Sequence, residues 1–224
     1  MQAEREGYTM KETTISKTNS ADDYIGYAFS AFGGLGMEVL LLILETTLYK
    51  QASGAWSDLQ VIIHWLATSC IWGCFGVILM KKLPAAPGNN LQKKNLILAA
   101  IISSISIIYT SLVWQGFKPA IEFSNLGAGK FLFQYIYYSL ESLLIVLIIA
   151  HGQKAFETKF GTSKPIPFGG IFLAATWGLV HIFTQGGSTG IDSVIQSMLF
   201  GTAYLVLTKN YKISYIAIAL MFML

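Results

Sequence analysis

Residues 131–152 read FLFQYIYYSLESLLIVLIIAHG and contain a single acid, Glu141. At a rise of 1.5 Å per residue, a helix of this stretch is about 33 Å long, and the hydrocarbon core of a bilayer is about 30 Å thick. His151 stands at the end of the stretch, next to a lysine-containing loop. The stretch is therefore predicted to be a membrane-spanning helix with Glu141 inside the membrane.

Similar apolar runs, separated by short polar breaks, occupy most of the chain. The other predicted spans are 24–49, 59–80, 95–117, 167–186, 191–208 and 213–224. Six of the seven spans are long enough to cross a bilayer, and the last one, with 12 residues, is expected to be a half-span. We therefore predict an all-α, polytopic transmembrane helix bundle of about seven spans, with 24–224 as a single transmembrane domain.

The composition agrees with a membrane protein and excludes other classes. Hydrophobic residues make up 54% of the chain and charged residues 12%, and the mean hydropathy is +0.55. So few charges cannot cover the surface of an ordinary soluble enzyme. Arg5 is the one arginine among 15 basic residues, so the chain lacks the arginines that nucleic-acid recognition usually needs, and we expect no nucleic acid among its partners.

The lysines predict the orientation. Residues 1–23 are polar with mixed charge and are predicted to be a disordered cytoplasmic leader. The leader and every second loop together hold 12 basic residues, and the loops on the opposite side hold 3. Because basic residues near span ends stay in the cytoplasm, we predict a cytoplasmic N-terminus. The expected location is a bacterial or archaeal plasma membrane.

Away from the ends of the predicted spans, five acidic or histidine side chains lie inside them: Glu38, Glu45, His64, Glu141 and His181. A carboxylate at the bilayer centre costs roughly 2.5 to 3.5 kcal/mol, so such groups normally face a protein interior or a wet cavity. The estimated depths of Glu38, Glu141 and His181 agree within about 5 Å, which predicts one shared cavity in the outer half of the membrane. For Glu45 and His64, either a pair across helices or contact with the lipid headgroups is expected.

Further polar side chains are predicted around the same cavity. Gln134, Gln185 and Gln196 would add hydrogen bonds to it, and Trp177 lies one turn before His181. Asp192 either lies at the rim of the cavity or caps a helix.

In ATWGLVHIFTQGG, the aromatic residue Trp177 stands four residues before His181. A helix rich in small residues follows and contains Phe200 and Gly201. In these features residues 131–224 resemble the C-terminal half of the intramembrane metalloproteases called the CAAX-protease and bacteriocin-processing (CPBP) family. Trp177 to His181 matches the family's Phe-x-x-x-His motif with Trp for Phe, and Phe200 and Gly201 are at matching positions.

The two other family motifs match less well. In the Glu-Glu-x-x-x-Arg motif, Glu141 matches the second Glu, while Leu140 and Ile145 replace the first Glu and the Arg. The last motif is a His followed four residues later by an Asn. The matching positions hold Ala219 or Leu220 in place of the His, and Met223 or Leu224 in place of the Asn.

The resemblance implies peptide hydrolysis by water activated between zinc and a Glu, with Glu141 and His181 as catalytic residues and zinc ligands. A catalytic zinc normally needs three protein ligands, and Glu38 is a candidate for the third. Three functions follow as expectations. The first is a family member with lost or reduced proteolysis that binds a membrane peptide or protein, the second an active zinc endopeptidase, and the third a proton-coupled carrier that uses Glu38, Glu45 and Glu141.

Overall fold

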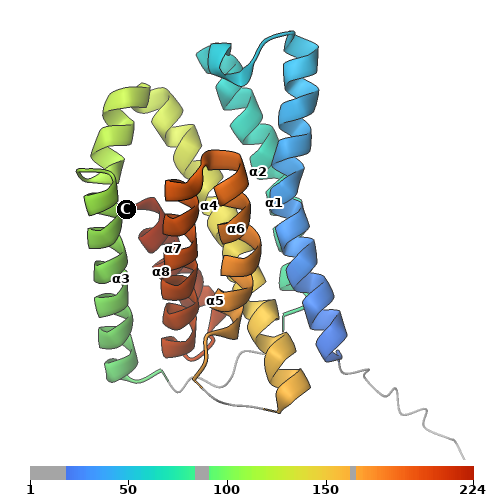
Figure 1. Ribbon diagram of the computed structural model, residues 1–224, viewed down its shortest axis with the longest axis vertical. Coiled ribbons are helices and arrows are strands. Elements are labelled where there is room, and N and C mark those ends of the chain that lie inside the picture. Colours follow the sequence, from blue (N-terminus) through green and yellow to red (C-terminus); the bar gives the residue numbers. More distant parts are fainter. Residues whose placement is uncertain (1–18, 84–90, 162–164) are drawn as a thin grey trace, which may run out of the picture.

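The computed structural model describes residues 19–83, 91–161 and 165–224, and this part of the chain is helical throughout with no strand (Figure 1). The helices are α1 (Ala21–Tyr49), α2 (Asp58–Met80), α3 (Lys93–Val113), α4 (Lys118–Phe160), α5 (Phe168–Leu173), α6 (Leu179–Gln185), α7 (Gly187–Val206) and α8 (Tyr211–Met223). A 3₁₀ turn, η1 (Ser53–Ala55), precedes α2, and a π turn, η2 (Ala174–Gly178), joins α5 to α6.

The predicted all-α class is confirmed for the described residues. Five helical segments are long and apolar enough to cross a membrane, namely α1, α2, α3, α4 and the continuous segment Phe168–Gln185. The 13-residue α8 is apolar but short, and the 20-residue α7 is not among the five. The chain is therefore an apolar helix bundle that fits an integral membrane protein, and seven membrane spans remain a prediction.

The first helix begins earlier than predicted. α1 begins at Ala21, because the Ser20 side chain accepts a hydrogen bond from the Asp23 backbone N–H and the Asp23 side chain accepts one from the Ser20 backbone N–H. This capping box stabilises the first turn. The prediction that the leader extends to residue 23 is thus wrong for its last three residues, and 1–18 lie outside the described residues.

The third and fourth predicted spans also have different boundaries. α3 ends at Val113, four residues before the predicted end, and Gln115 follows with a positive φ of 53°. α4 begins at Lys118, 13 residues before the predicted span, and bends at Gly127, whose φ is 71°. A residue without a Cβ adopts this backbone conformation readily, so the chain turns there from a short first segment into the long central one.

The long segment of α4 forms the centre of the bundle. The side chains of residues 144–150 are all at most 1% exposed. α4 packs against α1 and α2 and against α5 and α8, and Figure 1 shows it passing between the α1–α2 pair and the remaining helices. A helix that is apolar on every face is buried on every face, so the run LIVLIIA determines the position of its neighbours.

Glycines bring α5 close to its neighbours. A Cβ on Gly201 of α7 would clash with the Cα atom of Gly170 on α5, and a Cβ on Gly169 would clash with the Ile149 carbonyl of α4. Small residues at such crossings let the helix backbones approach closely. The van der Waals packing that results favours helix association inside a membrane, where the hydrophobic effect does not. This close approach fixes the direction in which the segment Phe168–Gln185 leaves α4.

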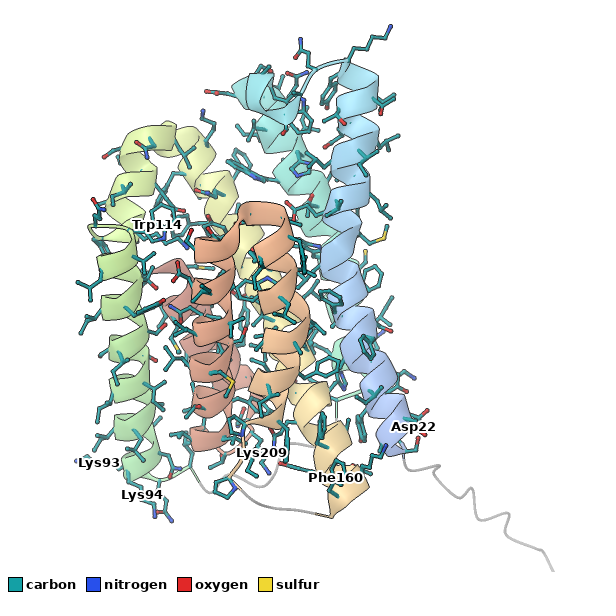
Figure 2. The ribbon with its side chains drawn as sticks, in the orientation of Figure 1. Asp22, Lys93, Lys94, Trp114, Phe160 and Lys209 are labelled. Atoms are coloured by element: carbon teal, nitrogen blue, oxygen red, sulfur yellow. The ribbon has the colours of Figure 1, made fainter. Side chains whose placement is uncertain are left out.

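The charged ends of the helices lie together at one end of the molecule. In Figure 2, Asp22, Lys93, Lys94, Phe160 and Lys209 are at the same end, and Trp114 lies toward the other. These lysines belong to the loops that the sequence analysis assigns to a single side. The arrangement of the helix ends therefore agrees with the predicted alternation of loops.

The glycine crossing gives a testable prediction. Gly201→Ala should lower the free energy of unfolding by about 1 to 3 kcal/mol, because the added methyl group forces α5 and α7 apart. The matched control is Gly36→Ala on α1, where a Cβ meets no atom within 4 Å. Unfolding of the purified protein in mixed micelles with increasing dodecyl sulfate measures both, and equal stability of the two variants would contradict the close crossing.

Candidate functional site

A cavity of about 750 Å³ lies between α1, α2, α3, α4, η2, α6, α7 and α8. It extends to the exposed side chains of Gln185 and Ser188 at the turn between α6 and α7. The residues that the sequence predicts for the site and that line this cavity are Glu38, Gln134, Glu141, Trp177, His181, Gln185 and Gln196. The structure thus brings together side chains from α1, α4, α6, α7 and the π turn.

Trp177 connects the two residues that carry the family resemblance. Its indole N–H donates to Glu141 Oε1 at 3.2 Å, and its ring centroid lies 4.4 Å from that of His181. Trp177 stands in η2, where the wider π turn interrupts the α-helix; such turns are frequent at functional sites. Glu141 is 8% exposed, and the indole therefore supplies a donor to a nearly buried carboxylate.

The His181 ring is oriented by its own helix. Its Nδ1 lies 2.7 Å from the Trp177 carbonyl oxygen. Because a carbonyl oxygen only accepts, Nδ1 carries the proton and Nε2 of the neutral ring is an acceptor. His181 lines the cavity, so it adds an acceptor to the cavity wall.

Glu38 joins the cavity from α1. Its Oε1 accepts a hydrogen bond from the Tyr137 hydroxyl at 2.6 Å, and it lies close enough to Glu141 and His181 to interact with both electrostatically. The expectation that Glu38, Glu141 and His181 share one cavity therefore agrees with their positions.

Glu45 and His64 lie beside the cavity and are not part of its lining. His64 Nδ1 is 2.5 Å from Glu45 Oε2, and His64 Nε2 is 3.6 Å from Glu38 Oε1. Glu45 and His64 are each 6% exposed. Of the two expectations for these residues, the pair across helices is the one that the structure shows.

Two buried charged residues at the start of α4 were not predicted from the sequence. Lys118 and Glu122 fall in a predicted polar break, yet they are only 6% and 4% exposed. Lys118 Nζ donates to the Phe222 carbonyl at 2.8 Å and interacts electrostatically with Glu122. The two Glu122 carboxylate oxygens accept hydrogen bonds from the hydroxyls of Tyr135 and Tyr138, each at 2.9 Å. The signal available in the sequence was the spacing of four residues between Lys118 and Glu122, which places the two side chains on one face of a helix that begins with Lys-Pro.

Polar contacts between α3 and α7 close another side of the cavity. Tyr109 donates to Asp192 at 2.5 Å, and the Gln196 amide bonds Ser106 at 2.6 Å and Thr110 at 2.9 Å. Asp192 lines the cavity and lies five residues after the first residue of α7. The alternative that Asp192 caps a helix is therefore wrong.

The donor set does not fit a zinc site with three protein ligands. Within the described ranges, no three His, Cys, Asp or Glu side chains gather where they could hold a metal ion. Glu141 accepts from Trp177, and Glu38 is held by Tyr137 beside His64. His151 is fully buried elsewhere, beside the Leu79 carbonyl at 3.3 Å, and takes no part in the cavity.

Comparison with known proteins gives no match, whether to a family model, to a curated protein or to a solved structure.

The buried pair of Lys118 and Glu122 gives a second prediction. Lys118→Met should lower the free energy of unfolding by about 3 to 5 kcal/mol, because it leaves a buried carboxylate without its cation. The control, Lys130→Met, removes an ion pair with Asp58, whose side chain is 74% exposed, and should cost about 0 to 1 kcal/mol.

The same unfolding titration in micelles measures these variants. Adding Glu122→Gln to Lys118→Met should restore part of the loss, because the remaining buried group is then neutral. A double variant as unstable as the single one would show that the loss does not come from the uncompensated carboxylate.

Proposed function

We propose that this chain is a non-catalytic membrane protein with a CPBP-like helix scaffold that binds a segment of a membrane peptide or protein in its cavity. The plasma membrane of a bacterium or archaeon is its proposed location, with the N-terminus in the cytoplasm. The single observation that carries the proposal is the polar cavity of about 750 Å³ inside an otherwise apolar bundle.

The size and lining of the cavity support binding. Sites for small ligands and side chains measure about 300 to 1,000 Å³ and combine aromatic walls with a few placed polar groups. Here Trp65, Tyr138 and Trp177 supply aromatic wall, and Glu141 and His181 supply polar groups. This space suits a few side chains of a partner.

The interactions of the matched motif residues favour binding over cleavage. Glu141 and His181 are held by the side chain and the backbone of the same tryptophan, and the positions that supply the remaining family ligands hold Leu140, Ala219 or Leu220. An active zinc endopeptidase needs a third ligand and an open position for water. We therefore rank the zinc endopeptidase below the binding protein as a proposed function.

A proton-coupled carrier is a second candidate, favoured by one observation. His64 joins Glu45 to Glu38, so an ionisable path extends along α1 to the cavity. Such relays of acids and histidines are common in proton-coupled transport. Flux into liposomes that depends on pH and disappears in Glu38→Gln would favour the carrier.

Site-specific photo-crosslinking in cells tests the proposed function. A benzophenone amino acid at Val113, which lines the cavity, should capture a peptide or protein as an adduct of defined mass. The matched control is the neighbouring residue Leu112, which is 73% exposed and outside the cavity lining, and which should capture only lipid.

Two outcomes would contradict the proposal. Lipid adducts alone at both positions would exclude a peptide or protein partner in the cavity. Stoichiometric zinc in the purified protein, lost in His181→Ala, would contradict the non-catalytic role and favour the endopeptidase.

A further inference from the structure

We infer that the cavity recognises a cation, namely the ammonium or guanidinium group of a basic side chain in the bound peptide. This inference rests on the proposed function and adds the chemical class of the segment that is bound. It follows from the charges around the cavity, from the direction of its hydrogen bonds and from its aromatic wall.

Acids outnumber cations in the lining of the cavity. Three carboxylates line it, those of Glu38, Glu141 and Asp192, and among the described lining residues Lys118 is the one lysine or arginine. The charge of Lys118 is shared, because the ammonium bonds the Phe222 carbonyl and interacts electrostatically with both Glu122 and Glu141. The carboxylates of the cavity thus exceed the positive charge that these residues supply.

His64 does not remove this excess. It lies between Glu38 and Glu45, so one imidazolium at most serves two carboxylates. Glu141 and Asp192 accept their hydrogen bonds from the neutral donors Trp177 and Tyr109. A carboxylate inside a membrane is costly without a cation, so a positively charged ligand would be stabilised there.

The hydrogen-bonding groups around the cavity also favour a cation, because they include acceptors that lack donors. The Tyr138 hydroxyl donates to Glu122 and accepts from Gln134 Nε2 at 2.8 Å, which fixes the orientation of the Gln134 amide. Gln134 Oε1 is then buried with no hydrogen-bond partner in the described part of the chain. His181 Nε2 is a second acceptor and lies in the cavity wall, where a donor from a ligand or from water would satisfy it.

Aromatic rings complete the environment of a cation. Trp65, Trp114 and Tyr138 line the cavity, and Lys118 already lies 4.7 Å from the Tyr138 ring centroid. Ring faces attract ammonium and guanidinium groups, and their apolar surface suits the methylene stem of a basic side chain.

A peptide fits this charge distribution better than a lipid headgroup does. The ammonium of phosphatidylethanolamine carries a phosphate a few atoms away, and that anion would lie against Glu141 and Asp192. A lysine or arginine side chain brings its charge on an uncharged stem and avoids this repulsion. We therefore assign the site to a basic residue of the partner.

Binding of short probe peptides to the full-length protein in maltoside micelles tests the inference. The probes are acetylated and amidated pentapeptides with four leucines around a central lysine, glutamate or norleucine. The lysine probe should bind to the wild type, and Glu141→Gln should weaken it about tenfold or more, as expected for a lost charge-assisted hydrogen bond. The control is Asp22→Asn, which makes the same change of charge at the opposite end of the molecule and should leave binding unchanged (Figure 2).

Each outcome separates the inference from the proposed function. The inference would be overturned if the lysine, glutamate and norleucine probes bound equally, or if Glu141→Gln and Asp22→Asn had equal affinity for the lysine probe. In either case, a protein adduct at Val113 would still support the proposed function. Loss of lysine-probe binding when phosphatidylethanolamine is added to the micelles would assign the cation to a lipid headgroup and overturn the peptide assignment. A Glu141→Gln variant that fails to fold is replaced by Asp192→Asn, for which the same weakening is expected.

Discussion

Carboxylates that lie among apolar helices need hydrogen-bond donors or cations, because a bilayer offers no water to replace them. In this chain the donors are mostly aromatic. Tyr137 serves Glu38, Trp177 serves Glu141, and two tyrosines serve Glu122. An aromatic side chain that is apolar along its body and polar at its tip can pack in the bundle and still donate, so these rings join α1, η2 and α4 around one polar layer.

The polar layer depends on the apolar packing next to it. The run at 144–150 holds α4 at the centre. Gly169 brings α5 close to α4, and Gly170 and Gly201 bring α5 and α7 close to each other. The π turn then places Trp177 over Glu141. The segment Phe168–Gln185 therefore serves two purposes. The glycines at its start make the close contact with α4 and α7, and Trp177 in its middle lines the cavity and bonds Glu141.

Hydropathy was sufficient to predict most of the fold. Each predicted span overlaps a helix, and the low charge content made five ionisable positions visible, of which Glu38, Glu141 and His181 line the cavity. Lys118 and Glu122 were missed because they stand in a polar break, where hydropathy predicts a loop. Their burial depends on Phe222, which is 104 residues from Lys118, and on the Tyr135 and Tyr138 hydroxyls that bond Glu122. The spacing of four residues indicates a contact between Lys118 and Glu122, but it does not indicate that both are buried.

Water access to the cavity tests this account most directly. With the exposed Cys70 and Cys74 replaced by alanine, a cysteine at Ser193, which lines the cavity, should react with a small charged methanethiosulfonate added outside intact cells. A cysteine at Ser197, one turn further along α7, fully buried and outside the lining, should not react. Equal reactivity at the two positions, or reaction at Ser193 only after the cells are permeabilised, would contradict a polar cavity open to the outer side.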